Sequence, residues 1–200
     1  MELQRIDEGL WRWTTPHPDW RPAEPDSVDD WGREVGSVLV NAADATVLID
    51  PLVPDDGWET LDAHVARWGF PVVVLTTIPW HERSRDAAVD RWSARTAGPG
   101  DDLPAGVELR PVEAAGESMV WLPAHRTLVP GDRLLGDADG GLRTCPESWL
   151  RSLPTPLDHA GLVLALRPLL ELPVRRVLVS HGSPVLEDGR AAIARALRDG

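Results

Sequence analysis

Polar side chains follow an apolar run within one short stretch, PVVVLTTIPWHERSRD at residues 71–86. His81 could bind a metal ion or transfer a proton near neutral pH, because the unperturbed pKa of an imidazole is about 6.5. Glu82 could complete an acid–base pair with it, and Arg83 could bind an anionic substrate. Two structural alternatives stay open: a partly exposed His81 paired with a neighbouring carboxylate, and Glu82 in the first turn of the next helix.

The other histidines and the single cysteine form no known motif. No two histidines have the His-x-His or His-x-x-x-His spacing of a zinc site. Cys145 is the only cysteine, which excludes an intrachain disulfide and a thiolate metal cluster. His17 lies in the long irregular segment at residues 14–33, where it could touch a substrate.

The composition is that of a globular protein and excludes several partners. A net charge of −12 argues against nucleic acids and anionic membranes, since both require a basic face. No apolar stretch approaches the roughly 20 residues of a membrane span, and the first residues lack the apolar core of a signal peptide. We therefore expect a cytoplasmic protein that acts on a small-molecule substrate or ligand. All 20 basic residues are arginine, so lysine Schiff bases are excluded.

Apolar periodicity predicts strands and helices along one domain that spans residues 1–200. Strands are expected at 5–15, at 38–40 and 47–49 as a hairpin, at 71–77, at several places within 107–136, and at 174–182. Helices are expected at 55–69, 82–96, 156–172 and 187–200. Asp55 or Asp56 could cap the first helix, and Gly69 should end it. This order favours two sheets between layers of helices.

The segments resemble the metallo-β-lactamase superfamily from about residue 35 to about residue 185. Three positions carry the resemblance: Asp50 in ATVLIDPLVP, Asp132 in LPAHRTLVPGDRLLG and His181 in VLVSHGSP. It implies an α+β fold, a four-layer αββα sandwich with the active site at an edge where strand ends converge. It also implies that Asp132 bridges metal ions, that His181 binds one of them, and that Asp50 orients the metal-binding loop.

Each of these three residues also has a purely structural interpretation. Asp132 follows a glycine and could be a turn residue, and His181 could be a hydrogen-bonding loop histidine. Asp50 could be a buried carboxylate that fixes a loop by accepting backbone N–H bonds.

The stretch TIPWHE departs from the family pattern His-x-His-x-Asp-His. Without a gap, Thr77 and Pro79 stand in place of the first two histidines, and His81 and Glu82 in place of the aspartate and the last histidine. A shift of one residue places His81 at the last histidine and Trp80 at the aspartate. A further family histidine, before the VWLP strand, is also missing, with Glu113 or Glu117 as its only polar alternatives. The usual two-zinc site is therefore not encoded.

Three hypotheses about function follow. In the first, His81, Asp132 and His181 hold one zinc, iron or manganese ion for the hydrolysis of an ester, lactone, amide or phosphoester. Here His81 and Asp132 are the catalytic candidates, and the remaining pocket candidates are Asp50, Thr77, Trp80, Glu82 and Arg83. In the second, an inactive relative without metal binds a small molecule or a protein in the retained cleft. In the third, His81 acts with Glu82 or Asp132 in metal-free acid–base chemistry.

Overall fold

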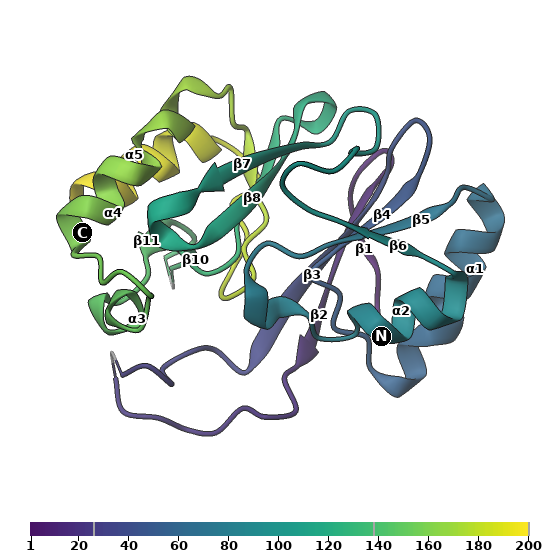
Figure 1. The fold of residues 1–200 in the computed structure, drawn as a ribbon, viewed down its shortest axis with the longest axis horizontal. Helices are drawn as coiled ribbons and strands as arrows, with labels where there is room; N and C mark the ends of the chain where they lie inside the picture. Colours follow the sequence, from purple (N-terminus) through teal and green to yellow (C-terminus); the bar gives the residue numbers. More distant parts are fainter. Residues whose placement is uncertain (26, 138, 200) are drawn as a thin grey trace.

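The computed structural model describes residues 1–25, 27–137 and 139–199 and has four layers (Figure 1). Two β-sheets lie in the middle, and helices cover the outer face of each, so the predicted αββα sandwich is confirmed. The helices are α1 (Trp58–Trp68) and α2 (Arg85–Trp92) on the first sheet, and α3 (Glu147–Arg151), α4 (His159–Leu166) and α5 (Gly189–Asp199) on the second. Among the described residues, no helix is long and apolar enough to cross a bilayer.

The first sheet has six strands in sequence order. They are β1 (Gln4–Asp7), β2 (Leu10–Pro16), β3 (Glu34–Asn41), β4 (Thr46–Ile49), β5 (Val72–Leu75) and β6 (Arg95–Ala97). Neighbours are antiparallel as far as β4, whereas β4, β5 and β6 run parallel with α1 and α2 in the connections. The predicted hairpin of β3 and β4 is present, with Val40 opposite Val47.

The second sheet has the order β12-β9-β8-β7. Its strands are β7 (Glu108–Val112), β8 (Glu117–Leu122), β9 (Thr127–Val129) and β12 (Arg176–Val177), and a separate hairpin joins β10 (Leu134–Gly136) to β11 (Leu142–Thr144). Short 3-10 turns lie at Asp55–Gly57, Pro79–His81, Glu113–Ala115, Pro123–His125 and Arg167–Glu171. Of the strand expected at 174–182, only Arg176–Val177 forms a strand of the sheet, although the N–H of Leu178 still donates to the carbonyl of Leu128.

Apolar side chains form three layers between the four layers of elements. Along β3, Val38 and Val40 pack toward the second sheet, whereas Leu39 packs toward α1, where it shares a cluster with Leu61. The third layer joins the second sheet to α4 and α5. Because the central strands are buried on both faces, they are apolar at successive positions rather than at alternate ones.

Several local predictions were wrong, including the end of the helix expected at 82–96, because Arg95–Ala97 form β6. The segment 5–15 is not one strand: Gly9, with φ +76°, turns the chain between β1 and β2. Neither Asp55 nor Asp56 caps α1, because residues 55–57 form a 3-10 turn that leads into it and no side chain bonds to its first N–H groups. Gly69, however, ends α1 in the left-handed conformation as expected.

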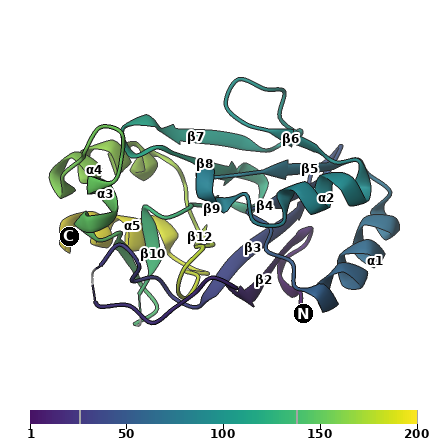
Figure 2. The same cartoon turned by 60° about the horizontal axis from the view of Figure 1, so that its bottom comes forward.

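Hydrogen bonds join the two sheets at one rim. The N–H of Gly36 in β3 donates to the carbonyl of Ser180, and the N–H of Ser118 in β8 donates to the carbonyl of Thr77 after β5. The segment between β2 and β3 extends from this rim toward α3 (Figure 2), where Trp149 Nε1 donates to the carbonyl of Ser27 at 3.1 Å. The rim therefore brings together chain segments that are far apart in sequence.

Candidate metal centre

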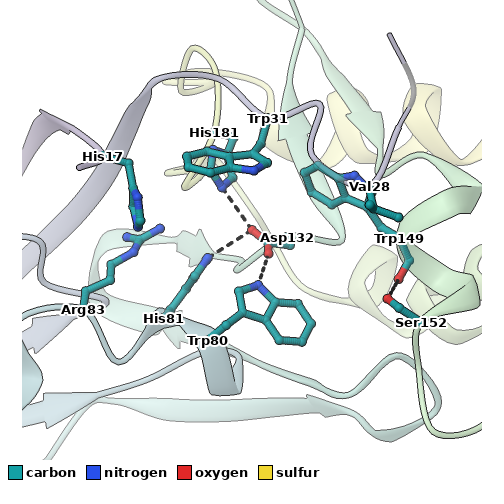
Figure 3. Close-up of a pocket in the computed structure, with 10 residues that line it drawn as sticks. All are labelled: His17, Val28, Trp31, Trp80, His81, Arg83, Asp132, Trp149, Ser152 and His181. Carbon is teal, nitrogen blue, oxygen red and sulfur yellow. Dashed lines mark hydrogen bonds and ion pairs between the residues drawn. The ribbon is translucent and has the colours of Figure 1, made fainter. Parts of the chain in front are cut away.

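Two histidines and one aspartate converge at this rim (Figure 3). His81 ends the 3-10 turn after β5, Asp132 lies in the loop after β9, and His181 follows β12. Asp132 Oδ1 lies 3.2 Å from His81 Nε2 and 3.4 Å from His181 Nε2. One potential ligand atom from each residue lies within 4.8 Å of the other two, and all three residues are buried. This is the set of three that the sequence predicted.

The imidazole of His81 is held from behind by Asp50. Its Nδ1 lies 2.9 Å from Asp50 Oδ2, and Thr77 donates to the same carboxylate through its backbone N–H at 2.8 Å and its hydroxyl at 2.5 Å. Asp50 has a φ of +47°, a left-handed conformation that is uncommon for residues other than glycine. A carboxylate on Nδ1 places the ring proton there and leaves Nε2 facing Asp132.

The charged side chains of this site change one another's pKa values. Burial alone lowers the pKa of His81, but the nearby carboxylates of Asp132 and Asp50 outweigh it and raise the pKa to about 9. Burial raises the pKa of Asp132, but His81 and His181 hold it well below its usual range. At neutral pH the metal-free site therefore contains a protonated His81 and an ionised Asp132.

Asp132 is positioned by two residues from other elements. Trp80 Nε1 donates to Oδ2 of Asp132 at 2.5 Å, whereas Oδ1 of Asp132 accepts no well-directed hydrogen bond from the described residues. Glu117, at the start of β8, accepts the backbone N–H groups of Gly131, Asp132 and Arg133 at 2.8–3.0 Å. Burial raises the pKa of Glu117 to about 7, against the opposing charge of Arg133.

Sequence reasoning treated Glu117 only as a polar residue near a missing ligand. The structure gives it a different role, because it fixes the backbone of the loop that carries Asp132. A signal for this role was present in the sequence, because Glu117 begins a strand that continues with the apolar run Met119–Leu122, all of which is buried in the structure. An acidic residue on the buried face of a strand needs several donors, here three backbone N–H groups.

A cavity of about 340 Å³ opens over these residues. Its lining is formed by His17, Val28, Trp31, Trp80, His81, Arg83, Asp132, Trp149, Ser152 and His181. The indoles of Trp31 and Trp149 meet the ring of His181 at centroid distances of 5.9 and 6.2 Å. Trp31, Trp149, Val28 and Ser152 were not predicted, because isolated residues in loops and short helices show no periodicity that would reveal them.

The remaining predicted residues divide between the cavity and the surface. Arg83 is in the cavity wall and donates to two backbone carbonyls and to the hydroxyl of Ser180. His17, which the sequence analysis placed in the long irregular segment, lines the cavity. Glu82 does not reach it: its exposed carboxylate pairs with Arg85 at 2.7 Å. In the acid–base hypothesis, Asp132 is therefore the remaining candidate partner of His81.

The donor set fits one divalent ion. Two imidazole nitrogens and one carboxylate oxygen form a typical three-residue ligand set for catalytic zinc, and the same set is known for iron. Asp132 Oδ1 is a buried acceptor without a directed donor, and His81 Nε2 becomes a lone-pair donor once its proton is lost. Trp80 already occupies the second oxygen of Asp132, so within the described residues nothing provides for a second ion.

Comparisons with solved structures identify the fold. A metallo-β-lactamase from Erythrobacter litoralis matches with a TM-score of 0.64 at 20% identity, over 98% of this chain and 90% of that one. An NDM_FIM-1-like metallo-β-lactamase from the same organism, in its mono-zinc form, matches with the same score and identity, over 98% and 94%. A metallo-β-lactamase from Pontibacter korlensis matches with a TM-score of 0.55 at 15% identity, over 100% and 99%. No family model and no curated protein matches the sequence. The chain thus has the metallo-β-lactamase fold.

Proposed function

We propose that this protein is a hydrolase that uses one divalent metal ion, bound by His81, Asp132 and His181. The observation that carries the proposal is the convergence of three buried ligand atoms within 4.8 Å at a cavity of small-molecule size. Zinc, iron and manganese are the candidate ions, and an ester, lactone, amide or phosphoester is the candidate substrate.

The ion would supply a nucleophile at neutral pH by lowering the pKa of a bound water to about 7. Residues of the chain orient the proposed ligands and limit the access of water. Asp50 holds the ring of His81 so that Nε2 faces the site, and Trp80 and Glu117 hold the carboxylate of Asp132. The indoles around the opening reduce the access of bulk water, which strengthens every charge interaction inside.

The test is the metal content of untagged protein purified without added metal, measured by plasma mass spectrometry. We expect close to one ion per chain, and its loss in Asp132→Asn and in His181→Gln. His64→Gln is the matched control, because His64 contacts Trp11 and Asn41 on the outer face of the first sheet. Absence of metal after incubation with excess zinc would overturn the proposal.

Activity is tested separately on the metal-loaded protein. A panel of chromogenic esters, lactones, amides and phosphoesters should include at least one substrate whose turnover is abolished by a chelator and restored by the ion. Turnover that persists in the chelator and is lost in His81→Gln would favour acid–base chemistry instead.

A second candidate function is ligand binding without a metal. It is favoured by the way the site charges already pair with one another, since His81 lies within 3.2 Å of a carboxylate on each side. A metal-free preparation that cannot take up zinc but binds small molecules in the cavity would establish this second function.

A further inference from the structure

The two proposed histidine ligands are held in different ways. The ring of His81 is fixed through its Nδ1, which lies 2.9 Å from Asp50 Oδ2. The ring of His181 is buried, and its Nδ1 has no hydrogen-bond partner among the described residues. A histidine that binds a metal is usually oriented by a hydrogen bond at its second nitrogen. His181 therefore has to be positioned through its backbone and through the indoles beside its ring.

The backbone of His181 is held by two neighbouring strands. His181 forms an antiparallel bridge with Val35 of β3, and its carbonyl accepts the N–H of Gly136 in β10 at 2.8 Å. The next residue, Gly182, has a φ of +84°, and a Cβ added to it would lie 2.3 Å from the carbonyl oxygen of Gly136. Only glycine fits there, so the turn that carries His181 packs directly on β10.

A buried arginine reaches the same turn from β2. One nitrogen of Arg12, Nη2, donates to the carbonyl of Val179 at 3.3 Å and to the carbonyl of Gly182 at 3.5 Å. These two residues lie on either side of His181, so a single nitrogen joins the two ends of the short segment that carries the proposed ligand. Gly36 makes room for this nitrogen, because a Cβ there would lie 2.7 Å from it.

The place of Arg12 in the fold is one that an apolar residue would normally fill. Leu10, two residues earlier on the same face of β2, belongs to the apolar layer between the sheets. Arg12 is 6% exposed, burial lowers its pKa, and no carboxylate of the described residues is paired with it. Because a buried charge without an ion-pair partner is costly, an apolar side chain would serve a packing role better. What the guanidinium adds is the pair of bonds to the turn.

We propose that Arg12 is a positioning residue for the metal site: it fixes the turn that carries His181 so that Nε2 of the ring faces Asp132. This inference rests on the proposed function, because it assigns to Arg12 the orientation of one of the three proposed ligands. Nε2 of His181 lies 3.4 Å from Asp132 Oδ1 (Figure 3), and loss of the bonds from Arg12 would let the imidazole turn away from it.

The first test is made on the full chain after chelator treatment, so that it does not depend on metal binding. In a proton–carbon correlation NMR spectrum, the Cε1–Hε1 group of each of the six histidines gives a signal, and His181→Gln identifies that of His181. We expect this signal to shift, broaden or split in Arg12→Met, which keeps the length of the side chain without its donors. Arg12→Gln, which is too short to reach both carbonyls, should have the same effect. An unchanged signal in either folded variant would overturn the inference.

Arg176→Met is the matched control. Arg176 is also a buried arginine, 8% exposed, but it donates to Asp7 and to the carbonyl of His125, at the other end of β9 from the site. Its replacement should leave the His181 signal in place, although it breaks an ion pair. A change of equal size in Arg176→Met would show only a general loss of packing and would overturn the role of Arg12.

Zinc affinity then measures the consequence for the site. Competition with a chelator should give a dissociation constant about 10–100-fold higher in Arg12→Met than in the unmodified protein, as for other residues that orient a ligand. Arg12→Lys should restore most of the affinity, because one nitrogen makes both bonds and an ammonium group can replace it. Equal affinities of the unmodified protein and Arg12→Met would overturn the inference. If the unmodified protein binds no zinc, the proposed function fails, and the NMR comparison still decides whether Arg12 positions His181.

Discussion

At the scale of single residues, the site depends on the two ring nitrogens of His81, which contact two different carboxylates. Nδ1 contacts Asp50 and Nε2 contacts Asp132, so one imidazole links two buried carboxylates. In the metal-free protein the proton on Nε2 compensates the charge of Asp132. A metal ion would take over that compensation, which means that binding of the ion releases a proton.

The stability of the metal-free protein should therefore depend on pH through His81. Its pKa is raised from about 6.5 in an unfolded chain to about 9 in the fold, so the stabilisation is complete below about pH 6.5 and is lost as the pH rises through about 9. We expect the free energy of unfolding in urea to fall between about pH 7 and about pH 9. The slope should be largely absent in His81→Gln; an equal slope in that variant would contradict the assignment.

The chain is well suited to this measurement. It contains no lysine and no tyrosine, the two side chains that normally titrate near pH 10. Burial raises the pKa of Cys145 from about 9 to about 11, so this thiol adds a fall in stability of its own above about pH 9, whereas the pKa of Glu117 is raised only to about 7. The effect of His81 is therefore measured between about pH 7 and about pH 9.

Trp80 provides a second test at the residue scale. Trp80→Phe removes the N–H that binds Asp132 Oδ2 and keeps an aromatic ring near Arg133. Residues that orient a metal ligand typically contribute about 10–100-fold to affinity, so zinc should bind more weakly by a factor of that order. Competition with a chromophoric chelator measures it, with Trp68→Phe on the outer helix α1 as the control. Tighter zinc binding would show instead that the indole competes with the ion.

At the scale of elements, the loop after β9 carries Asp132 and has no room for a larger residue at Gly131. A Cβ added there would lie 2.6 Å from Thr77 Oγ1 and 3.1 Å from Glu117 Oε2, the two groups that hold the site. The loop, the 3-10 turn after β5 and the start of β8 therefore fit together as one packed unit.

Gly131→Ala should disturb that unit. We expect a loss of about 1–3 kcal/mol of unfolding free energy from overpacking, together with weaker metal binding. Gly98→Ala is the matched control, because an added Cβ there meets nothing within 4 Å. Denaturant unfolding of both variants measures the difference, and equal stabilities would show that Thr77 can move aside at little cost.

The same elements show what sequence reasoning could and could not predict. β4 and β5 were predicted because burial on both faces leaves a continuous apolar run. The turn at Gly9 was missed because apolar residues on either side of it mimic a single strand. Motif order pointed to Asp132 and His181, but their approach to His81 depends on the packing of two sheets. Trp31 and Trp149 line the cavity through loop and short-helix geometry, which no local pattern encodes.

At the scale of the whole molecule, the three proposed ligands join the two sheets. His81 follows a strand of the first sheet, whereas Asp132 and His181 follow strands of the second. An ion bound by all three would cross-link them and bind only the folded chain.

Zinc should accordingly stabilise the protein as a whole. At a free concentration about 100 times the dissociation constant, a ligand of the folded state contributes about 2.7 kcal/mol, which corresponds to about 5–10 °C in Tm for a chain of this size. Differential scanning calorimetry with and without zinc measures the shift. Asp132→Asn should show none, and an undiminished shift in that variant would mean that zinc binds elsewhere.

The chain order of the two sheets has a practical consequence. Every described strand and helix of the first sheet and its cover lies before residue 98, and every one of the second lies after residue 106. A cut in the exposed connection 98–106 would yield two fragments, each with an apolar sheet face that only the other can cover. Such fragments should reassociate, and metal uptake would then report on their complementation, since neither fragment carries the complete ligand set.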